Sequence, residues 1–373
     1  MWKIKFQKAE ILIVAFIVLG SFFIISRYQN LAGDFQQYGS EVLTNHQTIL
    51  NARIQQRLPD SIAVNNDLHF YFFGDLMIDR HVGEQLTGKP LSLLFSNFGD
   101  DYFWQTGDIV GVNLEGAVTD EGKHLPPQNA YDFAFAPERI AELKSYGFNY
   151  FNSANNHFTD QGLQGVEETR NNLDKLGVYH SGAADAIIDD NSLTEVNVNG
   201  RKVALIGFSM VYNNFDLTKA KSLVTEAQLN SELVIINIHW GTEYEHQFSK
   251  HQQTIAHHLI DAGADVIIGH HPHVVQGMEI YQSKPIFYSL GNFIFDQYFS
   301  EDTQEGLSVG LSFGQTTTIF LYPLKSEKAY PRLMTADEQN KFFKKFISWS
   351  IIESEEEAKI KDGRLELPST VID

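Results

Sequence analysis

Histidines concentrate in one segment of the chain, from His239 to His273, which holds eight of the fourteen histidines. His239 directly follows the apolar run 233–238, and the cluster His270-His271-Pro272-His273 follows the apolar run 264–268 after one glycine. Imidazoles delivered at the ends of buried strands suit a metal ion of borderline softness. Surface histidines on loops are the alternative. The metal interpretation is favoured because loops elsewhere in the chain supply acids and amides that complete a ligand set.

Carboxylate and amide residues stand at the same kind of position in the first half of the chain. Asp75 follows the apolar run 68–73, Glu115 follows the run 109–112, and Asn156-His157 follow the run 150–154. Two carboxylates, an amide and several imidazoles form a mixed nitrogen and oxygen set that suits Mn, Fe or Zn. Two such ions about 3.5–4 Å apart, bridged by a carboxylate, are the usual frame for metal-assisted phosphoester hydrolysis, so this pattern predicts that chemistry.

The elements that must position these residues alternate along the chain. Apolar runs predict strands at 68–73, 109–112, 150–154, 203–208, 233–238, 264–268 and 286–290. Amphipathic runs predict helices at 137–146, 162–176 and 250–262, each followed by a glycine. This alternation predicts an α/β fold with a layered sheet, in which a polar site lies beyond the strand ends. Further on, 341–357 predicts a helix and 364–367 a short strand, with no chemistry expected in either.

Length and composition narrow the class of protein. The 373 residues suffice for one large α/β domain with appendages. The formal net charge of −19 argues against a nucleic-acid partner, which would need a basic face, and is compatible with binding metal cations. The chain has no cysteine, which excludes disulfides, thiolate metal sites and cysteine nucleophiles.

The N-terminus predicts a membrane anchor. Lys3, Lys5 and Lys8 precede a mostly apolar, uncharged run at 11–26, which is a little short of the ~20 residues of a typical span. Lysines on this side predict that the N-terminus is inside and the remaining chain outside the cell membrane. A cleaved signal peptide is the alternative, but no small-x-small cleavage site follows the run, which favours an uncleaved anchor.

Six short phrases, taken in order, resemble a known family. They read Gly74-Asp75-Leu-Met77-Ile-Asp-Arg80, Asn113-Leu-Glu115, Ala154-Asn-Asn-His157-Phe-Thr-Asp160-Gln-Gly162, His239-Trp-Gly-Thr-Glu243-Tyr244, His271-Pro-His273-Val-Val-Gln276 and Tyr288-Ser-Leu-Gly-Asn292-Phe. Together they resemble the CapA/PgsA-like capsule (poly-γ-glutamate) synthesis family, within the calcineurin-like metallophosphoesterase superfamily. The resemblance implies a layered, metallophosphoesterase-like β-sandwich flanked by helices, and two divalent metal ions.

The resemblance also implies roles for individual residues. The implied metal ligands are Asp75, Glu115, Asn156, His239, His271 and His273. Asp75 and His273 would hold the first metal, Glu115 would bridge, and the other three would hold the second. His157 would protonate the leaving oxygen, and Arg80 would clamp a phosphate or carboxylate.

One position departs from the superfamily pattern. A histidine usually stands two residues after the first Asp, and here that residue is Met77. Asp79 or His81 would have to compensate, or the first metal would be held weakly. This departure bears on the phosphatase chemistry and leaves the expected fold unchanged.

Each candidate also has a purely structural interpretation. Asp75 could cap a turn, Glu115 could pair with Arg80, Asn156 could be a left-handed turn residue, and His157 could orient other groups without touching substrate. Asp160 is expected to cap the helix that begins near Gly162. Glu243 and Asn292 stay open between a site role and a structural one, and His270 is left out of the ligand set.

The sequence supports two functions of different classes. The first is a membrane-anchored, extracytoplasmic, metal-dependent hydrolase in capsule or poly-γ-glutamate biosynthesis, acting on an anionic cell-envelope polymer or a phosphoester. The second is a non-catalytic metal-binding component of a polymer synthesis and export complex with synthase subunits as partners. The expected organisation is an anchor at 1–27, a stalk at 28–66, the main domain at 67–325 and a C-terminal elaboration at 326–373.

Overall fold

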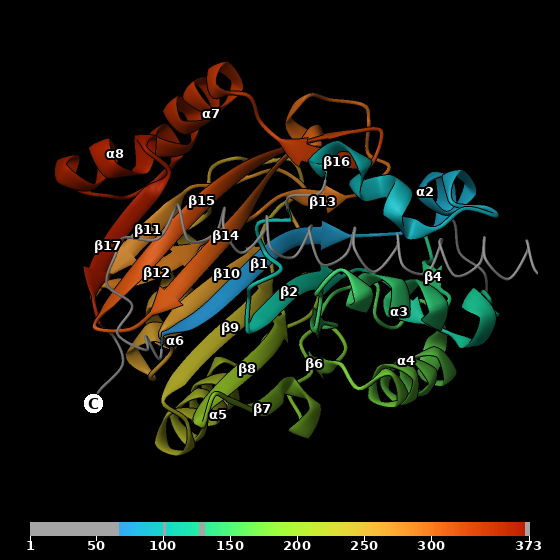
Figure 1. The fold of residues 1–373 in the computed structure, drawn as a ribbon. Helices are drawn as coiled ribbons and strands as arrows, with labels where there is room; N and C mark the ends of the chain where they lie inside the picture. The colour runs from blue at the N-terminus through green and yellow to red at the C-terminus, as the bar shows by residue number, and fades with distance from the viewer. Residues whose placement is uncertain (1–66, 100–101, 127–130, 370–373) are drawn as a thin grey trace, which may run out of the picture. The chain divides into compact units, whose positions relative to one another are not determined.

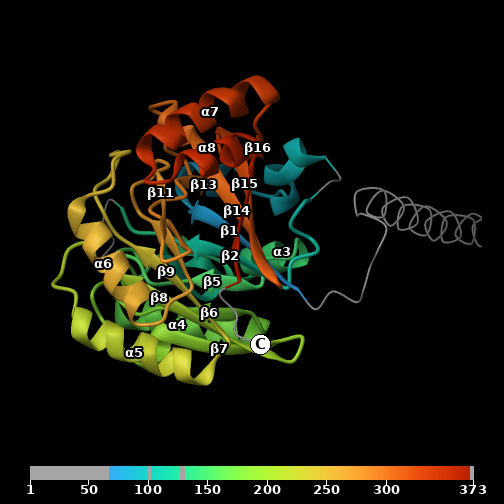
Figure 2. The same ribbon diagram turned by 90° about the vertical axis from the view of Figure 1, so that its left-hand side faces the viewer.

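Two β-sheets pack face to face, and helices cover their outer sides (Figures 1 and 2). The computed structural model describes residues 67–99, 102–126 and 131–369. The predicted α/β class is confirmed for this part of the chain. The predicted anchor and stalk lie outside it. Within the described ranges, no helix has both the length and the apolar character needed to cross a membrane.

The first sheet joins a parallel half to an antiparallel half. Its order is β16 (Tyr330–Leu333), β15 (Thr316–Glu327), β14 (Glu305–Phe313), β1 (Leu68–Leu76), β2 (Ile109–Leu114), β5 (Tyr150–Asn152) and β6 (Tyr179–Ser181). In addition, β13 (Asn292–Ile294) pairs with β1, and β17 (Arg364–Pro368) pairs with β15. Strands β1, β2, β5 and β6 run parallel, so their carboxyl ends lie at one edge.

The second sheet has a parallel centre with one antiparallel strand at each edge. Its order is β11 (Met278–Tyr281), β12 (Lys284–Phe287), β10 (Val266–His270), β9 (Leu233–His239), β8 (Arg201–Ser209) and β7 (Leu193–Val198). Strands β8, β9, β10 and β12 run parallel. A small pair, β3 (Ala117–Val118) and β4 (Ala134–Phe135), lies apart from both sheets.

The helices follow the strands in the order expected of an α/β chain. The α-helices of the described part are α2 (Arg80–Gln85), α3 (Pro137–Ser145), α4 (Gly162–Leu176), α5 (Leu217–Asn230), α6 (Lys250–Asp261), α7 (Ala336–Trp349) and α8 (Ser354–Lys361). The 3-10 helices are η1 (Leu91–Phe98), η2 (Asp120–Gly122), η3 (Asp190–Ser192) and η4 (Asp302–Gln304).

Three apolar cores hold the layers together. Phe72 of β1 and Ile235 of β9 belong to the core between the two sheets. Helices α3 and α4 and η1 cover the outer face of the first sheet, and α5 and α6 cover that of the second. Because β2, β9 and β10 are buried on both faces, they appear in the sequence as apolar runs without alternation.

Local signals set the helix ends. α3 begins at Pro137, and α4 ends where Gly177 adopts a left-handed φ of 61°. α6 begins with a capping box, in which Ser249 and Gln252 each bind the other's backbone N–H. These signals were readable in the sequence, and the helices predicted at 137–146, 162–176 and 250–262 end within one residue of the observed ones.

Two predicted elements need correction. β1 does not stop at Gly74-Asp75 but runs on to Leu76, because Asp75 N donates to Gly291 O at 2.9 Å and β13 pairs beside it. The single helix predicted at 341–357 is wrong: α7 ends at Trp349 and α8 begins at Ser354. The backbone between them is extended, and Ile351 N donates to Met278 O at 2.8 Å.

Candidate metal centre

The carboxyl ends of four parallel strands, two from each sheet, meet at one place. β1 carries Asp75 and Glu115 follows β2, whereas β9 ends at His239 and β10 ends at His270. Asn113 reaches across the two sheets, since its Nδ2 lies 2.8 Å from Asp75 Oδ1 and 3.2 Å from His239 Nδ1. Residues far apart in the sequence are thus brought into one buried site.

Asp75, Glu115 and His239 form a first group of potential ligands, here called the inner group. One ligand atom from each lies within 4.8 Å of the others, and all three side chains are fully buried. The nearest His239–Glu115 approach is 3.8 Å, between Nε2 and Oε1. Two carboxylates and an imidazole from three strand ends are a donor set that a divalent ion can bind.

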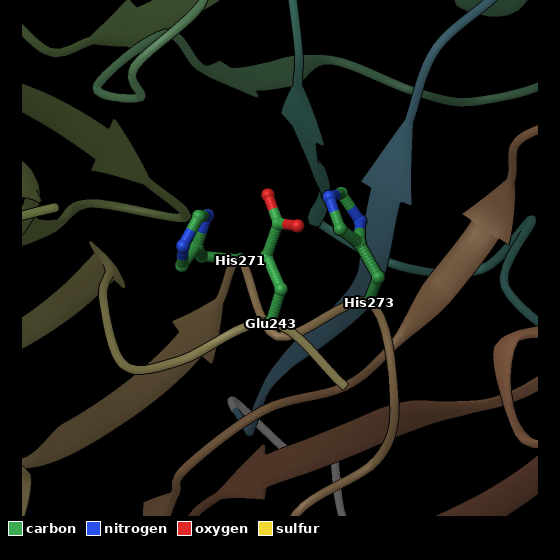
Figure 3. A group of neighbouring side chains, drawn as sticks. All are labelled: Glu243, His271 and His273. Atoms are coloured by element: carbon green, nitrogen blue, oxygen red, sulfur yellow. The ribbon is translucent and has the colours of Figure 1, made fainter. Parts of the chain in front are cut away.

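Glu243, His271 and His273 form a second group, here called the outer group. Their ligand atoms also lie within 4.8 Å of one another. Figure 3 shows the Glu243 carboxylate pointing between the two imidazoles. Both histidines are buried, whereas Glu243 is exposed.

Direct contacts connect the two groups. His239 Nε2 lies 2.8 Å from Asn156 Oδ1 and 3.2 Å from His271 Nδ1. His273 Nδ1 lies 3.3 Å from Asp75 Oδ2. All six side chains predicted as ligands are therefore neighbours in space.

The surroundings of Glu115 fit a bound cation. Its Oε2 is buried and has no hydrogen-bond partner, although a buried carboxylate oxygen left unpaired costs considerable free energy. In the described part of the chain, the ion pairs of Asp75 and Glu115 are with histidines, and no lysine or arginine offsets their charge. A divalent ion held by these carboxylates would supply the missing partner and the missing positive charge.

Burial decides the protonation of the inner side chains. Burial, reinforced by the charge of Asp75, raises the pKa of Glu115 well above its usual value. For Asp75, burial acts in the same direction, but the neighbouring imidazoles of His270 and His273 outweigh it and hold its pKa well below the usual value. The two carboxyls thus differ strongly in their affinity for a proton.

Burial acts on the histidines in the opposite sense. It lowers the pKa of His239 well below its usual value, and the nearby His271 lowers it further. Burial, with a smaller effect of His273, lowers the pKa of His271 to about 3. Both imidazoles are therefore neutral at pH 7, which is the form that binds a metal ion.

His157, the predicted proton donor, is held by Asp160. Its Nδ1 lies 2.8 Å from Asp160 Oδ2, which leaves Nε2 for a substrate. The prediction that Asp160 caps α4 is wrong: Gln161 is the N-cap, and Asp160 accepts from Phe133 N at 3.1 Å. The carboxylate instead orients the imidazole, as in other acid–base pairs.

Arg80 lies near the site but already has a carboxylate partner. Its guanidinium makes a bidentate ion pair with the Asp296 carboxylate, in which Nε lies 3.0 Å from Oδ2. It also lies over the ring of Phe133, 5.0 Å from its centroid. Its predicted role as a clamp for substrate stays a prediction, and that role would require it to share or leave Asp296.

Neither residue suggested as a substitute for Met77 points at the site. Met77 is fully buried, and its Sδ lies 3.2 Å from Asp79 N. The Asp79 carboxylate caps α2 and lies 3.0 Å from His124 Nε2. His81 is exposed and pairs with Glu84.

Two residues of this site, His270 and Asn113, were not among the predicted ligands. His270 is fully buried, and its Nδ1 lies 3.5 Å from Asp75 Oδ1. Asn113 binds Asp75 and His239, as described above. Asn292, whose role was left open, holds His273 through a 3.0 Å contact between Oδ1 and Nδ1. Burial in a strand end was the available signal for His270 and Asn113, since polar side chains within apolar runs need buried partners.

Backbone conformations rare for side-chain-bearing residues gather at the site. His271 and His273 have φ of 99° and 58°, and Arg80 and Tyr244 have φ of 48° and 67°. Such conformations persist only where surrounding contacts fix them, and they are frequent at functional sites. Here they aim His271 and His273, two residues apart, toward Glu243.

A pocket of about 440 Å³ opens beside the outer group. Glu243, His273 and His157 line it, together with the Arg80–Asp296 pair. Exposed aromatic side chains stand in its wall, namely Tyr131, Tyr212, Tyr244 and Phe299. A small organic group fits this volume while touching both the proton donor and the potential ligands.

Several known proteins have similar sequences. The family model for the bacterial capsule synthesis protein PGA_cap matches residues 69–297. The capsule biosynthesis protein CapA of Bacillus anthracis is 31% identical over 292 residues, which cover 73% of this chain and 71% of the relative. The PGA biosynthesis protein CapA of Bacillus subtilis (strain 168) is 30% identical over 313 residues, covering 79% and 80%. A solved structure, a hypothetical protein from Thermus thermophilus, is similar with a TM-score of 0.43 and 12% identity, over 72% of this chain and 99% of that one.

Proposed function

The chain belongs to the bacterial capsule synthesis (PGA_cap) family, and we propose that it is a metal-dependent, phosphoesterase-like hydrolase in capsule or poly-γ-glutamate biosynthesis. The observation that carries the proposal is the buried carboxylate pair Asp75 and Glu115, which is surrounded by imidazoles and has no lysine or arginine partner among the described residues. Without a cation this arrangement would be costly in free energy, whereas with one it becomes a reaction centre.

The ligands proposed for the ions are Asp75, Glu115, Asn156, His239, His271 and His273. When bound, divalent ions supply Lewis acidity, which polarises a phosphoryl oxygen and makes water nucleophilic at neutral pH. Asn113 orients Asp75 and His239, and Asn292 orients His273. These contacts fix the direction of each donor atom before any ion enters.

His157 would give a proton to the leaving oxygen from Nε2. Asp160 holds Nδ1 and so fixes the ring orientation and the tautomer. The ring of Phe133, with its centroid 4.3 Å from that of His157, shields one face of the imidazole from water. The pocket beside Nε2 is the place where the leaving group would lie.

We further propose that the N-terminal segment anchors the protein and places the site outside the cytoplasm. The support is the order of three lysines followed by the apolar run 11–26. An extracytoplasmic site agrees with the absence of cysteine and with the capsular polymers named for the relatives. An anionic polymer or phosphoester substrate and synthase subunits are the proposed partners.

A second function is kept because of Met77. This buried thioether stands where the superfamily usually has a ligand, so the ions could serve to bind an anionic polymer without hydrolysing it. The protein would then be a metal-binding component of a synthesis and export complex.

Hydrolysis by the full chain separates the two functions. The purified protein, loaded with Mn²⁺, Fe²⁺ or Zn²⁺, is assayed on p-nitrophenyl phosphate and bis(p-nitrophenyl) phosphate. Activity that disappears in His239→Ala and persists in His251→Ala, an exposed histidine of α6, supports the hydrolase. Metal bound without hydrolysis of either ester, or equal activity in both variants, would favour the second function or an unrelated contaminant.

A further inference from the structure

We propose that Glu243 is a metal ligand and completes, with His271 and His273, an outer metal position that opens on the pocket. The proposal rests on the proposed function in one respect: it takes the inner group to hold the other ion. It adds a ligand that the family resemblance did not imply. It also divides the histidines differently, because His271 and His273 now share one ion.

The backbone around Glu243 is fixed to the loop that carries the two histidines. Tyr244 N donates to Pro272 O at 2.8 Å, between His271 and His273. Tyr244 has a φ of 67°, and Gly241 turns the chain with a φ of 95°. The Trp240 ring is buried and donates to Tyr288 O at 2.8 Å. These contacts hold Glu243 beside the imidazoles.

The separations suit one ion after a small movement. In a tetrahedral site, donor atoms about 2.0–2.2 Å from a metal lie roughly 3.3–3.6 Å apart. The three donor atoms lie within 4.8 Å of one another, so movements of about 1 Å or less would bring them to these separations. Glu243 is exposed and can make that shift, whereas the buried histidines supply the fixed part of the site.

The two positions differ in access to solvent. The three side chains of the inner group are fully buried, but Glu243 and His273 line the 440 Å³ pocket. Catalytic metal ions keep a coordination position open to water or substrate. The outer position has that opening, with His157 on the same pocket.

Charge favours a cation here over the alternative that Glu243 only faces solvent. Among the described residues, the salt bridges include none to Glu243, and the nearby Arg80 is paired with Asp296. Glu243 would add a carboxylate from the pocket side, opposite to Asp75, which lies 3.3 Å from His273 Nδ1 on the inner side.

Manganese binding tests the proposal without relying on activity. The full chain is stripped of metal and titrated with Mn²⁺, and free Mn²⁺ is followed by electron paramagnetic resonance. The wild type is expected to bind two equivalents. Glu243→Gln keeps the side-chain size but removes the charge, and should weaken one equivalent at least tenfold, since even residues that only orient ligands change metal affinity about 10–100-fold. Glu243→Asp should restore part of the loss.

Glu245→Gln is the matched control. Glu245 is exposed in the same loop and carries the same charge, so an unspecific electrostatic effect would appear in both variants. Two equivalents bound with unchanged affinity in Glu243→Gln, or equal weakening in both variants, would overturn the proposal and leave the hydrolase intact. A wild type that binds no Mn²⁺ or Zn²⁺ at all would overturn the proposed function as well.

Discussion

Glu115 is a residue whose burial favours function at the expense of stability. In the metal-free protein its Oε2 lacks a partner, and its charge lies close to that of Asp75. We expect Glu115→Gln to raise the free energy of unfolding of the metal-free protein by about 1–3 kcal/mol, because the amide removes the charge and can donate to Asp75. Urea unfolding in the presence of a chelator measures this, and the same variant should lose metal and hydrolysis.

The stability difference between Glu115→Gln and the wild type should depend on pH. The pKa of Glu115 is raised in the folded state, so the folded protein holds this proton more tightly than the unfolded chain. Near and below the usual value of 4.5 the carboxyl is protonated in both states and the variant gains little. As pH rises through the raised folded-state pKa, the wild type loses stability relative to the variant. A pH-independent difference would contradict this account of Glu115.

His157 gives a prediction about rate that leaves metal binding unchanged. We expect His157→Gln to lower kcat about 100-fold, because a positioned general acid typically contributes roughly 10²–10⁴-fold. Bound Mn²⁺ should stay at the wild-type level. His180→Gln is the control, since His180 also pairs with a carboxylate, Asp174, at 3.0 Å but lies on β6. Loss of metal in His157→Gln would make His157 a ligand instead.

Strand β1 passes so close to the turn before β13 that only glycine fits at position 74. A Cβ on Gly74 would lie 1.9 Å from Gly291 O. We therefore expect Gly74→Ala to lower the free energy of unfolding by about 1–3 kcal/mol, the range for overpacking. Gly83→Ala in α2 is the control, because its nearest contact would be 3.3 Å. Denaturant unfolding of the two variants measures both free energies. Equal decreases would show that the backbone around Gly74 relaxes enough to accept a methyl group.

The strands and helices could be predicted because their signals are local. The buried parallel strands appear as apolar runs, and Pro137, Gly177 and the Ser249–Gln252 box mark helix ends. The split between α7 and α8 could not be predicted, because it depends on a contact with β11, far away in the sequence. The extension of β1 to Leu76 depends on β13 in the same way.

Several members of the candidate site could be selected from the sequence, but the contacts between them could not. Position at a strand end was enough to select Asp75, Glu115 and His239. It did not show that Asn113 would touch two of them, because that requires knowing that the two sheets face each other. Nor did it show that Arg80 would pair with Asp296, 216 residues further on.

For the whole molecule, the site lies where the two sheets meet, so bound ions would join them. Asp75 and Glu115 come from the first sheet, and His239 comes from the second. Mn²⁺ at 100 times its Kd should raise the free energy of unfolding by about 2.7 kcal/mol per ion, because the unfolded chain cannot assemble the site. Thermal unfolding with and without Mn²⁺ measures this, and His239→Ala should remove most of the shift. Binding of Mn²⁺ without a rise in the unfolding temperature would contradict this prediction.

The complete burial of the inner side chains also affects how fast metal ions leave the protein. An ion at Asp75, Glu115 and His239 would be held by fully buried side chains, whereas one beside Glu243 would face an open pocket. Chelator added to the loaded protein should therefore remove metal in two phases, a fast one from the pocket and a slow one limited by opening of the fold. The inner ion would be the last to leave, so a shortage of metal would empty the pocket position first and leave half of the centre loaded.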